Sequence, residues 1–317
     1  MADPEILSTA PAPTAPTTPT IPSPPRNTVF RGPNGIRAGW RVLIFLSISA
    51  GLGILLALIL ALISRGRTGL AAISQLTPLG LSISEGAIFF LTAVPALIMS
   101  RIERRSFGKY GLPIRSAFLG DFWIGALIGF LSISACLLAI FAFHGFHLTA
   151  LAIHGGAILS ATAAWGATFI LVGLAEEFSF RGYLQFTLTG GMGFWPSAIL
   201  LSLLFAGAHA ANPGESKTGL LSVVMFALLF CFFLRRTGNL WWAVGFHAGW
   251  DWGQTFFYGV PDSGILPYHN LFNCTFSGPN WLTGGSVGPE ASVFTFIVLV
   301  VVAIMFATVY RENRYQA

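Results

Sequence analysis

The sequence predicts an all-α membrane protein, a polytopic helical bundle of about eight transmembrane helices. Three observations support this fold class. Of the 317 residues, 54% are hydrophobic and only 9% are charged, whereas soluble domains carry about 25% charged residues. The apolar residues fall into successive runs, several of which reach the roughly 20 residues that a helix needs to cross a bilayer. The basic residues gather in alternate connecting segments, as they do in cytoplasmic loops.

The first 37 residues have a different composition. The segment STAPAPTAPTTPTIPSPP repeats Pro, Thr and Ala without apolar periodicity, and such a segment cannot bury a core. No apolar region of signal-peptide type follows the start. We therefore expect residues 1–37 to be a disordered cytoplasmic tail and residues 38–317 to form the transmembrane domain.

Eight spans are expected, in chain order, at residues 41–64, 82–100, 119–143, 158–187, 194–211, 219–234, 239–258 and 291–310. An even number of spans places both termini on one side of the membrane. With that side cytoplasmic, all but three of the 17 Lys and Arg residues lie in cytoplasmic segments or in the cytoplasmic ends of spans, the exceptions being Arg65, Arg67 and Lys217. The positive-inside rule thus fixes the orientation and accounts for the net charge of +5 without binding to nucleic acid.

A few ionisable residues interrupt these spans: Glu85, Asp121, Glu176, Glu177, Arg181, His209, His247 and Asp251. Each costs about 3 kcal/mol at the membrane centre unless it is paired or hydrated, so such residues usually mark a functional site. Glu85 and Asp121 lie near span ends, where we expect a structural or interfacial role. The other six fall into three groups on separate spans.

The first group lies in LAEEFSFRGYLQ, residues 174–185, at the end of a long apolar run. Glu177 and Arg181 are four residues apart, so they share one helix face with the acid on the N-terminal side, which favours an ion pair. Glu176 points about 100° away from Glu177. We expect Glu177 and Arg181 to brace the helix and Glu176 to be free to act.

The second and third groups each place two side chains four residues apart. These pairs are Phe205 with His209, and His247 with Asp251. At a rise of about 1.5 Å per residue, Glu176, His209, His247 and Asp251 fall at overlapping depths in the middle or inner half of the membrane. A single histidine in a helix is usually a core residue, but these groups together predict one shared polar cavity.

Two kinds of hydrolytic chemistry suit this set of side chains. A glutamate can activate water as a general base, while imidazole N–H groups and Asp251 stabilise an oxyanion or protonate a leaving amine. The same types of atoms bind zinc, with Glu176, His209 and His247 as the candidate ligands. No HExxH zinc helix occurs in the chain. The residues therefore leave both a cofactor-free and a zinc-dependent mechanism open.

The three groups also match known motifs in order. EEFSFR fits EExxxR, FAGAH fits FxxxH, and HAGWD fits Hxxx(N/D). Over about residues 80–310 the chain resembles the CAAX protease and bacteriocin-processing family of intramembrane endopeptidases, in its bacterial branch. This family includes the type II CAAX prenyl endopeptidase of eukaryotes.

The resemblance implies a helical bundle with a polar cavity that opens toward the cytoplasm. In it Glu176 would activate water, His209 would assist the water or the substrate carbonyl, and His247 with Asp251 would stabilise the oxyanion. Glu177, Arg181 and Phe205 would support these groups. Asp251 stands where the eukaryotic branch has Asn, so it would instead hold the tautomer of His247 or bind a metal. The expected substrate is a peptide bond of a small or membrane-associated protein, and the expected location is a bacterial plasma membrane.

Two other classes of function compete with a peptidase. A proton-coupled transporter could relay protons through buried Glu and His side chains, but transporters often contain internal repeats and this chain shows none. A non-catalytic scaffold or immunity-type membrane protein would need only the fold. The complete set of acids and histidines favours the peptidase, because binding alone does not require it.

Overall fold

The computed structural model describes residues 28–32, 35–63, 77–265 and 268–316, and contacts divide the chain into two units, 1–37 and 38–317. In the first unit, β1 (Arg31–Gly32) pairs antiparallel with β2 (Gly35–Ile36). The Pro-rich residues 1–27, for which we expect disorder, lie outside the described residues.

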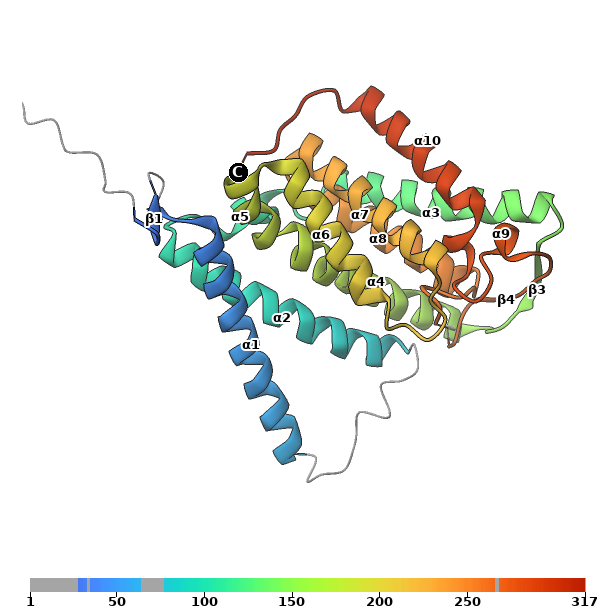
Figure 1. Ribbon diagram of the computed structural model, residues 1–317. Helices are drawn as coiled ribbons and strands as arrows, with labels where there is room; N and C mark the ends of the chain where they lie inside the picture. Colours follow the sequence, from blue (N-terminus) through green and yellow to red (C-terminus); the bar gives the residue numbers. More distant parts are fainter. Residues whose placement is uncertain (1–27, 33–34, 64–76, 266–267, 317) are drawn as a thin grey trace, which may run out of the picture. The chain divides into compact units, whose positions relative to one another are not determined.

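The second unit is almost entirely helical (Figure 1), which confirms the predicted all-α class. Its α-helices are α1 (Ala38–Ile63), α2 (Pro78–Ile102), α3 (Gly120–Ala142), α4 (Gly156–Arg181), α5 (Tyr183–Met192), α6 (Phe194–His209), α7 (Lys217–Thr237), α8 (Trp241–Asp251), α9 (Asn280–Thr283) and α10 (Val293–Val309). Short 3-10 turns are η2 (Phe107–Tyr110), η3 (Ile114–Ser116) and η5 (Pro289–Ala291), and a π-helical segment is η4 (Trp252–Phe257). Its strands β3 (Phe146–Leu151) and β4 (Phe272–Phe276) pair antiparallel.

Each expected span coincides with a helical segment, although several ends differ. Within the described residues, α1, α2, α3, α7 and the continuous stretch of α4 and α5 are long and apolar enough to cross a membrane, and α6 and α10 are shorter apolar helices. The expected span 158–187 is divided at Gly182 into α4 and α5. The expected span 239–258 is α8 followed by η4. The chain is therefore an integral membrane protein.

Local sequence signals explain where two of these helices begin or end. α2 begins after Thr77, whose hydroxyl accepts a hydrogen bond from the Gly80 amide at 3.1 Å, as N-cap residues do. α7 begins after Ser216 with an equivalent bond and ends at Gly238, which has φ +77°. Only glycine adopts this left-handed conformation without strain, so it stops the helix there.

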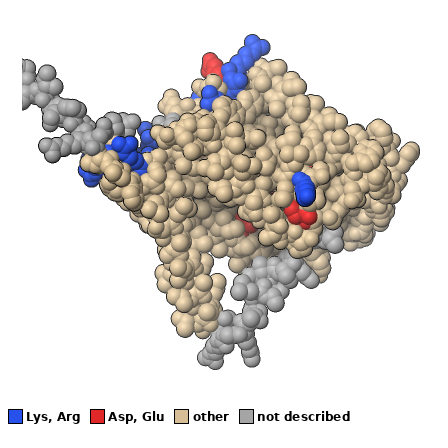
Figure 2. Space-filling model, in the orientation of Figure 1, with Lys and Arg blue, Asp and Glu red and all other residues tan. Residues whose placement is uncertain are grey.

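The surface of the bundle is apolar. Figure 2 shows a face dominated by uncharged side chains, with Lys and Arg in a few places. On α1 the only buried residue is Phe45, while large apolar residues such as Leu58 and Leu62 are exposed. Such a helix is suited to contact with lipid acyl chains.

α8 lies in the middle of the bundle and packs closely on α3. A Cβ atom added at Gly129 on α3 would overlap the carbonyl oxygen of Phe246, and one at Gly249 on α8 would overlap that of Ala126. Glycines thus allow the two backbones to touch, as small residues do between membrane helices. This contact fixes α8, which carries His247 and Asp251.

Gly129→Ala is expected to destabilise the protein by about 2 kcal/mol, because the added methyl group must displace the backbone of α8. The measurement is the denaturation midpoint in detergent. Gly51→Ala on α1 is the matched control, since no atom lies within 4 Å of a Cβ added there. Equal stability of the two variants would contradict the close packing of α3 and α8.

α2 runs parallel to α4 and in contact with it. The hydroxyl groups of Ser82 and Thr168 lie 2.9 Å apart, and those of Thr92 and Ser179 lie 3.5 Å apart. These two contacts set the register between the helices. They place the buried Glu85 of α2 beside the segment of α4 that precedes Glu176.

A carboxylate joins the ends of several helices on one side of the bundle. Glu103 accepts hydrogen bonds from the Tyr110 hydroxyl at 3.0 Å, from the Tyr183 hydroxyl at 2.6 Å and from Nε of Arg41 at 2.8 Å. These residues come from η2, α5 and α1. The cluster therefore ties α1 to the rest of the membrane domain.

Candidate active site

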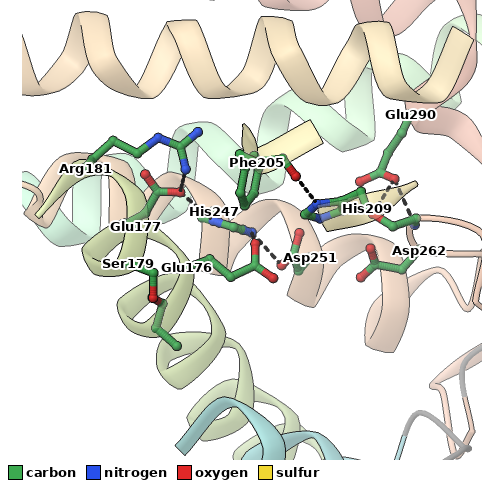
Figure 3. A network of polar contacts seen from close by, with 12 residues as sticks. Glu176, Glu177, Ser179, Arg181, Phe205, His209, His247, Asp251, Asp262 and Glu290 are labelled. Atoms are coloured by element: carbon green, nitrogen blue, oxygen red, sulfur yellow. Dashed lines mark hydrogen bonds and ion pairs between the residues drawn. The ribbon is translucent and has the colours of Figure 1, made fainter. Parts of the chain in front are cut away.

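A cavity of about 340 Å³ lies between α2, α4, α6, α7 and α8 and reaches the loops that follow η4 and precede α10. Glu176, Phe205, His209, His247 and Asp251 line it. The three sequence groups, which are far apart in the chain, thus meet at one place (Figure 3).

Glu177 connects α4 to α8 from a fully buried position. Its Oε1 atom lies 3.5 Å from Nη1 of Arg181 and 3.0 Å from Nδ1 of His247. The Glu177 and Arg181 side chains are both 0% exposed. The guanidinium of Arg181 also lies 4.4 Å from the centre of the Phe205 ring. Glu177 therefore holds both the cation and the imidazole, whereas the sequence predicted only the first contact.

His247 lies among three carboxyl groups. Its Nδ1 must donate its hydrogen to Glu177, because a carboxylate only accepts. Its Nε2 lies 3.3 Å from Oδ2 of Asp251 and 3.6 Å from Oε2 of Glu176. The ring also stacks on Phe230. At these distances a proton must reside on Nε2 or on one of the two facing carboxyls.

Glu176 differs from Glu177 in its exposure. Its side chain is 22% exposed, against 0% for Glu177, and it lines the cavity. The one-residue offset turns it to another helix face, as the 100° step predicts. Glu176 is therefore the carboxyl of the pair that water can reach.

His209 approaches the cavity from α6. Its Nδ1 lies 3.0 Å from the Phe205 carbonyl oxygen and must donate to it, because that oxygen can only accept. Its Nε2 then keeps a free lone pair. The Phe205 ring lies between His209 and Arg181, and the centres of the Phe205 and His209 rings are 4.5 Å apart.

The predicted zinc ligands do not form a compact set in this arrangement. Within the described part of the chain, the group of His, Cys, Asp or Glu residues whose ligand atoms lie within 4.8 Å of one another is Asp251, Asp262 and Glu290. Glu176, His209 and His247 are not grouped this closely in the described residues, so a zinc site formed by these three stays a prediction.

The structure adds three carboxyl groups to the cavity that the sequence did not place there: Glu85, Asp262 and Glu290. Glu85, for which we expect a structural or interfacial role, is 7% exposed. Asp121, with the same expectation, lies in the first turn of α3 and accepts a hydrogen bond from the Asn239 side-chain amide at 3.4 Å, and it does not line the cavity.

Glu290 lies in η5, just before α10, and Ser292 is the residue that caps α10. Oε2 of Glu290 accepts hydrogen bonds from the amide and the hydroxyl of Ser263, at 2.8 and 3.1 Å. No sequence signal marks this role, because Gly- and Pro-rich loops give no periodicity from which a contact can be read.

The neighbouring acidic groups change the pKa of the two carboxyls in the loops, Asp262 and Glu290. Burial, with repulsion from Asp251, raises the pKa of Glu290 to about 8, and Glu215 adds to the repulsion. Burial and the charges of Asp251 and Glu290 likewise raise the pKa of Asp262 well above its usual range. Both carboxyls thus hold a proton more tightly in the folded protein.

We expect stability to fall between about pH 5 and pH 8 because of these groups. The folded state binds more protons than the unfolded state in this range, so raising the pH favours unfolding. Glu290→Gln, which does not titrate, is expected to flatten this dependence, leaving the part due to Asp262. Denaturation midpoints in detergent from pH 5 to pH 9 measure the effect, and parallel curves for both proteins would contradict it.

With this geometry established, comparison with known families identifies the domain. The family model described as type II CAAX prenyl endopeptidase Rce1-like matches residues 158–253. These residues match an Rce1-like domain. Over residues 158–253 the family resemblance predicted from the three motifs is therefore confirmed. No curated protein matches the chain.

The Rce1-like domain extends from α4 through α8 and carries Glu176, His209, His247 and Asp251. This match supports a peptidase that acts on protein substrates within a membrane. Glu85, Asp262 and Glu290 lie outside the Rce1-like domain. The cavity therefore combines family motifs with acids contributed by the rest of the chain.

Proposed function

We propose that this protein is an intramembrane endopeptidase that cleaves a small or membrane-associated protein by water activated by Glu176. The observation that carries the proposal is the difference in burial and in partners between the adjacent glutamates Glu176 and Glu177. Glu177 is buried and held by Arg181 and His247, whereas Glu176 faces the cavity and water. A general base must have this access.

Each lining residue then has a defined task. Glu176 removes a proton from a water molecule that His209 orients through the free lone pair of Nε2. The water oxygen attacks the carbonyl carbon of the substrate. The N–H at Nε2 of His247 donates to the developing oxyanion. Glu176 then passes its proton to the leaving nitrogen, so the carboxylate is regenerated.

Asp251 acts through His247 in this proposal. Its Oδ2 lies 3.3 Å from Nε2 of His247, on the side where Glu176 also lies. A carboxylate there keeps a proton on Nε2 and so maintains a donor toward the oxyanion. This explains how Asp serves where the eukaryotic branch has Asn.

The orientation remains that predicted from the basic residues: both termini cytoplasmic, in a bacterial plasma membrane. Arg235 and Arg236 in the last turn of α7 support it, because they lie at the expected cytoplasmic end of that helix. The substrate would then enter from the cytoplasmic side.

The test is cleavage of a varied synthetic peptide library by the purified protein in detergent, with and without a chelator or added zinc, read by mass spectrometry. We expect cleavage that the chelator leaves unchanged. Cleavage that is lost on chelation and restored by zinc would replace the glutamate–water mechanism with a metal-dependent one. The absence of cleavage across the library would favour the scaffold instead.

A further inference from the structure

The cavity is markedly acidic for a site inside a membrane protein. Five carboxyl residues line it: Glu85, Glu176, Asp251, Asp262 and Glu290. None of the described lining residues is Lys or Arg. Arg181 on α4 is fully buried, is paired with Glu177 and does not line the cavity. Among the described lining residues, the imidazoles of His247 and His209 are therefore the only groups that can take up a positive charge.

Three of these carboxyls converge at the end of the cavity formed by the loops. Oxygen atoms of Asp251, Asp262 and Glu290 lie within 4.8 Å of one another. Hydrogen bonds hold two of them in place, from the Thr255 hydroxyl to Asp262 at 2.6 Å and from Ser263 to Glu290. The side chains are thus fixed in a like-charged group that a cation would stabilise.

A second and independent observation comes from α2. Glu85 is 7% exposed and lines the same cavity, yet its Oε2 atom has no hydrogen-bond partner. A buried carboxyl oxygen without a donor is unfavourable and is normally satisfied by protein, water or ligand. Glu85 therefore presents an unused acceptor to whatever occupies the cavity.

We propose that the cavity binds a Lys or Arg side chain of the substrate peptide, close to the bond that is cleaved. This inference rests on the proposed function, because a peptide must enter the cavity beside Glu176. The ammonium or guanidinium would donate to Asp262 and Glu290 and neutralise them. Hydrogen bonds between charged partners are about twice as strong as neutral ones. The raised pKa values of Asp262 and Glu290 agree, since without a cation these carboxyls retain protons.

The distribution of the acids favours a side chain over a metal ion. Asp251, Asp262 and Glu290 are close enough together to surround one ion, but Glu85 on α2 is not a member of that group. A long cationic side chain with several N–H groups can donate to acids spread along the cavity, whereas a metal ion held by the group of three leaves Oε2 of Glu85 without a partner. A free peptide carboxylate would meet no Lys or Arg among the described lining residues.

The test measures binding rather than cleavage, so it is independent of catalysis. Glu176→Gln protein is immobilised and exposed to a randomised peptide library that contains Lys, Arg, norleucine and Glu at each position. The bound fraction is then sequenced. We expect Lys or Arg to be enriched about tenfold over norleucine at one position, as charge-assisted hydrogen bonds provide. Enrichment without cleavage by the wild type would refute only the proposed enzyme activity.

Two variants are expected to reduce this enrichment to about threefold or less. One is the double variant Asp262→Asn with Glu290→Gln, and the other is the single variant Glu85→Gln. The two sets lie on different elements, so one remains informative if the other fails to fold. Glu312→Gln, an exposed carboxyl outside the cavity, is the control. Absence of a preference for Lys or Arg, including an empty bound fraction, would overturn the proposal. Enrichment of Lys or Arg that survives in every variant would also overturn the proposal. Stoichiometric binding of Mg²⁺, Ca²⁺ or Zn²⁺ that these variants abolish would overturn it in favour of a metal site.

Discussion

Glu176→Gln is expected to lower kcat about 10³-fold while leaving the fold intact. Glutamine has the same shape but cannot accept a proton from water. The Glu176 side chain is partly exposed to the cavity, and its carboxyl contacts His247. The exchange therefore removes the base without opening a void. Initial rates on the best library peptide, with the denaturation midpoint in detergent, measure both parts.

The control for this prediction is Glu312→Gln, because that side chain is 79% exposed and lies in the C-terminal segment. It should retain the wild-type rate. If Glu176→Gln still cleaves within about tenfold of the wild type, the base is another residue. A loss of rate that accompanies an equal loss of stability would instead give Glu176 a structural role.

Arg181→Met is expected to cost about 3–5 kcal/mol of folding free energy, the largest stability effect we predict. The variant leaves the carboxylate of Glu177 buried beside His247 without its cation. It also removes the guanidinium from the faces of Phe205 and Phe230, which lie 4.4 and 5.9 Å from it. Chemical denaturation in detergent micelles measures the change.

The double variant Glu177→Gln with Arg181→Met separates the ion pair from packing. Because both charges are removed, no unpaired carboxylate remains, and we expect part of the lost stability to return. If Arg181→Met alone lowers the folding free energy by less than about 1 kcal/mol, the Glu177–Arg181 ion pair contributes no more than an exposed ion pair does. A double variant less stable than Arg181→Met would show that Glu177 is needed mainly by His247.

The spans and the three motifs could be predicted because their signals are local. A run of about 20 apolar residues predicts a membrane helix without knowledge of its neighbours. Residues four apart, such as Glu177 and Arg181 or His247 and Asp251, share a face in any α-helix. For the same reason Glu176 could be separated from Glu177 by one helical step.

The sequence by itself therefore determined the helical class, the approximate spans and the side chains that share a helix face. Only the tertiary structure decided that Glu177 holds His247 as well as Arg181, and that Glu85, Asp262 and Glu290 join the cavity. These contacts connect residues from about 70 to 200 positions apart in the chain. They depend on how α2 and α8 pack on α4 and on irregular loops, and neither has a periodicity that hydropathy can reveal.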